Sequence, residues 1–116
     1  MHHAQGAFSE TLYVYGEAIR LALRGKGNRF LVVGLGLGYV ELLSAVEALR
    51  AKQTIYLHSL EANEWLRAYF SNWVEGKEVP NPFQAAYDGM AERFAEYGRV
   101  EASQVRAFLQ KARELG

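Results

Sequence analysis

Residues Phe30–Tyr39 read F-L-V-V-G-L-G-L-G-Y, and this stretch decides the fold that we expect for the chain. Its four leading apolar residues predict a buried strand over Arg29–Val33, and the three alternating glycines predict a turn that follows it. Apolar residues then recur at helical spacing, which predicts a helix over Tyr39–Lys52. Glycines in such a turn accept positive φ angles, and a ligand can approach the backbone and the free N–H groups that begin the helix.

The spacing of the glycines distinguishes three kinds of nucleotide-binding loop. A phosphate-binding P-loop is excluded, because Tyr39 and Val40 stand where it requires Lys and Ser or Thr. A dinucleotide-binding fingerprint, G-x-G-x-x-G, requires its third glycine one residue later than Gly38. The pattern G-x-G-x-G after an apolar strand resembles motif I of methyltransferases that use S-adenosylmethionine (SAM), although Val33 stands where many of them carry an acid. A tight turn with no ligand remains the alternative.

A second strand is expected over Thr54–Leu60, and it ends directly at Glu61. A strand, a helix and a second strand within about 35 residues predict a right-handed unit whose two strands are parallel. Ligands bind beyond the carboxyl ends of such strands, where the glycine turn and Glu61 would meet. A carboxylate there can accept both hydroxyls of a ribose. The same acid also suits a helix N-terminus capped by Asn63, and the two roles are compatible.

The rest of the chain is expected to be mainly helical. Residues Met1–Phe8 are interpreted as a loop or arm, and Ser9 as the N-cap of a helix that ends near Arg24. Three further helices are expected over Asn63–Glu75, over Phe83–Tyr97, and from Glu101 or Ser103 to Leu115.

Composition predicts one folded domain without a strong electrostatic preference. Of 116 residues 50% are hydrophobic, and 13 basic residues balance 13 acidic ones. No basic patch supports nucleic-acid binding, and no apolar run approaches the ~20 residues of a membrane span. The absence of cysteine excludes disulfides and thiolate sites. His2 and His3 are not expected to form a metal site, and with no secretory signal we expect a cytoplasmic protein.

Two parallel strands make an incomplete sheet. Both strands are expected to be buried, and each needs neighbours for its backbone hydrogen bonds. We therefore expect either a truncated α/β domain or self-association through unpaired sheet edges. Within this scheme, residues 1–28 form an N-terminal arm and helix, residues 29–76 the cofactor-binding core, and residues 77–116 a helical segment.

Three segments together resemble the MnmC-like methyltransferases. They are Gly6–Tyr15 (G-A-F-S-E-T-L-Y-V-Y), the glycine turn Gly34–Gly38, and Ser59-Leu60-Glu61 at the end of the second strand. These bacterial enzymes use SAM to methylate an aminomethyl group on the wobble uridine of tRNA. The resemblance implies the front half of a Rossmann-like SAM-methyltransferase fold, with SAM as cofactor and tRNA as partner.

The resemblance also assigns roles to individual residues. Glu61 would bind the ribose hydroxyls of SAM, and the other residues expected at the cofactor are Gly34, Leu35, Gly36, Gly38, Glu10 and Tyr13. The later family segment that carries the active-site acid has no counterpart here, so no catalytic residue is assigned. The alternatives are a catalytically inert domain, an NAD(P)-binding module and a helical interaction domain.

Overall fold

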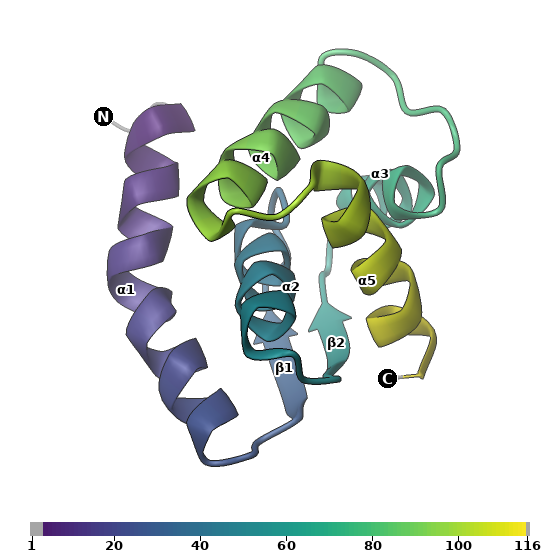
Figure 1. Ribbon diagram of the computed structural model, residues 1–116. Coiled ribbons are helices and arrows are strands. Elements are labelled where there is room, and N and C mark those ends of the chain that lie inside the picture. Colours follow the sequence, from purple (N-terminus) through teal and green to yellow (C-terminus); the bar gives the residue numbers. More distant parts are fainter. Residues whose placement is uncertain (1–3, 116) are drawn as a thin grey trace.

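Five helices and two short strands make up the computed structural model, which describes residues 4–115 (Figure 1). In chain order the elements are α1 (Ala4–Arg24), β1 (Arg29–Val33), α2 (Tyr39–Ala51), β2 (Tyr56–Leu60), α3 (Glu64–Val74), α4 (Phe83–Gly98) and α5 (Ala102–Leu115). The turn between β1 and α2, residues 34–38, is the glycine turn predicted above.

The strands β1 and β2 pair in parallel, as the sequence predicts. Their register runs from Arg29 opposite Tyr56 to Val33 opposite Leu60. The N–H group of Gly34 extends this pairing by donating to the carbonyl oxygen of Leu60 at 2.8 Å. The carboxyl ends of both strands therefore lie side by side, at the point where the glycine turn begins.

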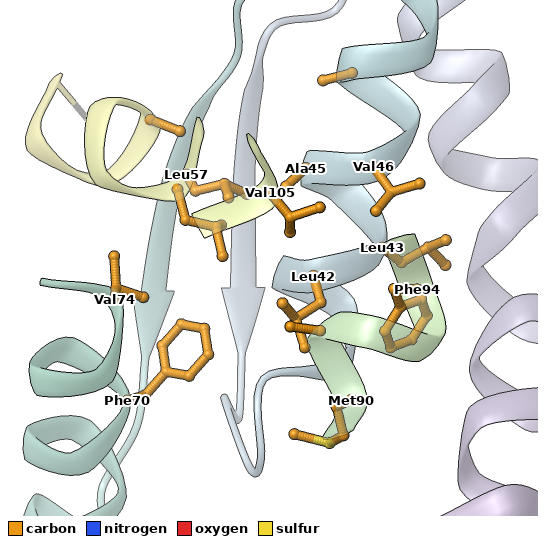
Figure 2. Close-up of a cluster of buried hydrophobic side chains, with 14 of the residues drawn as sticks. Leu42, Leu43, Ala45, Val46, Leu57, Phe70, Val74, Met90, Phe94 and Val105 are labelled. Carbon is orange, nitrogen blue, oxygen red and sulfur yellow. The ribbon is translucent and has the colours of Figure 1, made fainter. Parts of the chain in front are cut away.

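Helix α2 is the centre of the molecule. It contacts α1, α4 and α5, and it lies against one face of the two strands (Figure 1). Its residues Leu42 to Val46 are almost completely buried. Figure 2 shows that side chains from β2, α3, α4 and α5 converge on it, among them Leu57, Phe70, Phe94 and Val105. This cluster is the hydrophobic core.

The expectation of a Rossmann-like methyltransferase fold is wrong. The described residues are mostly helical and form a two-stranded sheet, so they do not show the layered sheet of that fold. The local strand, turn and helix are present, but the chain after α3 continues as α4 and α5, which pack on α2. The result resembles a compact helical domain that contains one parallel strand pair.

The expectation that both strands are buried is also wrong. Val32 and Leu57 belong to the buried core, but on the opposite face of the sheet Leu31 and Val33 are 62% and 75% exposed. Leu60 is exposed on the same face as Val33, its partner in the register. Among the described residues each strand pairs with one neighbour, and self-association through the free edges stays a prediction.

Two helix starts can be compared with their predicted caps. Helix α1 begins at Ala4 instead of Ser9, and the Phe8 ring packs 4.7 Å from the Phe94 ring, so residues 4–8 of the predicted arm belong to the helix. Asn63 caps α3 as predicted, because its side-chain oxygen accepts from the N–H groups of Trp65 and Leu66. Within residues 4–115, none of the helices has the length and apolar character needed to span a membrane.

Candidate functional site

The glycine turn has a backbone that only glycine adopts easily. Gly34, Gly36 and Gly38 all have positive φ angles, of 81°, 55° and 88°. The N–H group of Gly38 closes the turn by donating to the carbonyl oxygen of Leu35 at 2.9 Å, and helix α2 begins with Tyr39. The first amide groups of a helix have no partner within it, so the turn and the helix start together offer backbone donors.

The three glycines differ in what surrounds them. A Cβ atom at Gly34 or Gly36 would meet no atom within 4 Å, so packing does not require glycine there. A Cβ at Gly38 would overlap the fully buried ring of Phe70. Gly38 is therefore needed for packing, whereas Gly34 and Gly36 leave the backbone open to a ligand.

Glu61 lies next to the open part of the turn. Its Oε1 atom accepts a hydrogen bond from the N–H group of Gly36 at 3.0 Å, and its Oε2 atom accepts one from Asn63 at 2.9 Å. These two hydrogen bonds lower the pKa of the Glu61 carboxyl below its usual value, and the bond from Asn63 has the larger effect. The group is therefore an anion at neutral pH, and each oxygen keeps a lone pair for a further donor.

The remaining predicted site residues are Leu35, Glu10 and Tyr13. Leu35 belongs to the turn, but its side chain is buried in the core and does not face a ligand. Glu10 and Tyr13 lie on α1, and the Tyr13 side chain is 88% exposed. The structure thus brings Glu61 to the glycines, whereas a cofactor role for Glu10 and Tyr13 stays a prediction.

A buried acid close to the turn was missed by the sequence analysis. Glu41, in the first turn of α2, is fully buried, and its Oε2 atom accepts a hydrogen bond from the Ser59 hydroxyl at 2.6 Å. Its Oε1 atom is buried without a hydrogen-bond partner in the described structure. Burial raises the pKa of Glu41, while the bond from Ser59 opposes this rise. The signal in the sequence was an acid at a position where the helical spacing of α2 requires an apolar residue.

Metal binding has no support in the part of the chain that the structure describes. No group of three or more His, Asp or Glu residues within 4–115 is arranged to hold an ion. His58 lies on strand β2, within the strand that the sequence predicts there, and its side chain is exposed. The pair His2 and His3 lies outside the described residues.

Taken together, the turn and Glu61 can bind a ligand that has a pair of hydroxyl donors and a part that lies against the backbone. The two acceptor oxygens of Glu61 match the adjacent hydroxyls of a ribose, and the open glycines permit close approach. Comparison with known family models, with curated proteins and with solved structures gave no match to this chain.

Proposed function

We propose that the chain binds a ribose-containing cofactor at the glycine turn, and that this cofactor is SAM. The observation that carries the proposal is the contact between Gly36 and Glu61, because it places a carboxylate at the open backbone where the strands end. In the bound state the ribose hydroxyls would donate to Glu61, and the methionine part would lie along Gly34 and Gly36.

The choice of SAM depends on the resemblance and on the glycine spacing. The third glycine, Gly38, comes too early for the dinucleotide fingerprint, which makes NAD(P) the weaker candidate. Methyl transfer to tRNA is the reaction that the resemblance implies. Because SAM is already an activated donor, that step requires mainly the correct placement of donor and acceptor, and the turn with Glu61 supplies the donor side.

Calorimetry tests the proposal directly. S-adenosylhomocysteine and NAD are titrated separately into the purified chain, into Glu61→Ala, and into Glu78→Ala as the matched control. Glu78 is exposed in the loop between α3 and α4, away from the turn. We expect micromolar binding of S-adenosylhomocysteine. Glu61→Ala should weaken it about tenfold or more, since the hydrogen bonds from the ribose hydroxyls to a charged carboxylate are lost.

Three results would contradict the proposal. Absence of heat with both ligands, from a chain shown by circular dichroism to be folded, would remove the cofactor site. Binding of NAD alone would replace SAM by a dinucleotide. Equal weakening by Glu61→Ala and Glu78→Ala would show that the ligand does not depend on the carboxylate at the turn.

A further inference from the structure

A cavity of about 300 Å³ lies between the start of α1, the start of α2 and one face of α4. Its volume is at the lower end of the range for small-molecule sites. Apart from two alanines of α4, the residues that line it are Phe8, Leu37, Tyr39, Gly89, Met90 and Arg93. The walls are therefore mainly apolar and aromatic, and Arg93 contributes the charge.

Gly89 keeps this cavity open. It lies in the interior of α4, where glycine destabilises a helix relative to alanine. A Cβ atom at Gly89 would meet nothing within 4 Å, so no packing contact requires glycine there. Gly98, in the same helix, is different because a Cβ there would overlap Val46. A larger side chain at position 89 would instead extend into free space, and Gly89 itself lines the cavity.

Arg93 has no anionic partner in the described structure. Its side chain is half-buried, and its guanidinium carbon lies 4.5 Å from the centre of the Phe8 ring. None of the ion pairs among the described residues includes it. The ring contact holds the guanidinium at the cavity wall, where its N–H groups remain available to a carboxylate.

We propose that this cavity binds a small organic monoanion with an apolar body, of the arylacetate type. The carboxylate would pair with Arg93, and the ring would lie among Phe8, Tyr39 and Met90, in the space that Gly89 leaves. Charge complementarity selects an anion, and the apolar lining selects its body. The proposal does not depend on the cofactor site, because it rests on residues of α1, α2 and α4 outside the contact between Gly36 and Glu61.

The test uses phenylacetate as the anionic probe and phenylacetamide as its uncharged counterpart. Binding is followed by amide chemical shifts of the ¹⁵N-labelled chain. We expect saturable shifts around Gly89 and Arg93 with phenylacetate, and at least tenfold weaker binding of phenylacetamide. Arg93→Gln should weaken phenylacetate binding by a similar factor, whereas Arg99→Gln, an exposed position just beyond the end of α4, should leave it unchanged.

A second pair of variants tests the location. Gly89→Leu should abolish binding by filling the cavity, and its midpoint of urea unfolding should not fall, because leucine favours a helix more than glycine does. Gly89→Ala should weaken binding less. The proposal is overturned by equal affinity for the two probes, by full binding to Gly89→Leu, or by no saturable shift at ~10 mM phenylacetate, a concentration well above a millimolar Kd.

Discussion

Replacing Gly38 by alanine separates the packing role of the glycine turn from its binding role. Two costs add at this position. A residue other than glycine in the left-handed region costs roughly 1–2 kcal/mol, and the φ angle of Gly38 is 88°. The new methyl group would also overlap Phe70, where even the Cδ1 and Cζ atoms lie 2.9 Å from the Cβ position.

The second cost is the larger one. Phe70 is fully buried and packs against Trp73 and Tyr87, so its ring cannot move aside without disturbing the core. Overpacking of this kind costs roughly 1–3 kcal/mol. The expected total for Gly38→Ala is therefore about 2–5 kcal/mol, a large part of the ~5–15 kcal/mol by which domains are stable.

Gly36→Ala is the matched control, because it carries the first cost without the second. A Cβ at Gly36 meets nothing within 4 Å, so the expected loss of stability is about 1–2 kcal/mol. Urea unfolding followed by the fluorescence of buried Trp73 should place the Gly38→Ala midpoint about 1–2 M below that of Gly36→Ala. Equal midpoints would refute the reasoning, because the contact with Phe70 would then carry no energy.

Three further predictions concern buried and titrating groups. Burial raises the pKa of Glu41, so the native protein loses stability as the pH rises from about 4 toward that raised pKa. Glu41→Gln lacks this loss, so its urea midpoint should improve relative to that of the unmodified chain between pH 4 and 7. A difference between the two midpoints that stays constant over this range would contradict the prediction. The hydrogen bond from the indole of Trp73 lowers the pKa of Asp88, so the stability of the native protein should fall as the pH drops from 5 to 3. The urea midpoint of Asp88→Asn should fall less over the same pH range. Tyr97 donates to the buried carboxylate of Glu47 at 2.6 Å, so Tyr97→Phe should cost about 1.5–3 kcal/mol in urea unfolding, and a loss near zero would show that Glu47 finds another donor.

Local elements were predictable from the sequence because their signals are local. The bounds of β1, Arg29–Val33, are those expected from its apolar run and its flanking glycines. Helices α2, α3 and α4 begin and end within a residue or so of the predicted positions, since their apolar spacing and their caps are written in neighbouring residues. The approach of Glu61 to the glycine turn was also predictable, because each follows the carboxyl end of one of two parallel strands and these ends lie side by side.

The arrangement of those elements was not predictable in the same way. A strand, a glycine turn and a helix are compatible with many architectures, and the inference of a Rossmann-like fold depended on strands that the described chain does not form. The exposure of Val33 and the burial of Glu41 have the same origin. Whether a side chain meets solvent depends on which distant helix covers it, and α4 and α5 carry that information far from β1 and α2 in the sequence.

The central position of α2 has a consequence for the exchange of its amide protons with solvent. Helices α1, α4 and α5 each rest on α2, so its amides from Leu43 to Ala48 become exposed only when the surrounding helices have separated. Their exchange should therefore report the free energy of global unfolding. Helix α1, whose main packing partner is α2, lies at the outside of the molecule and should open earlier and at lower free energy. The outer helices would then unfold first, and the amides of the helix after the glycine turn would be the last to lose their protection from exchange.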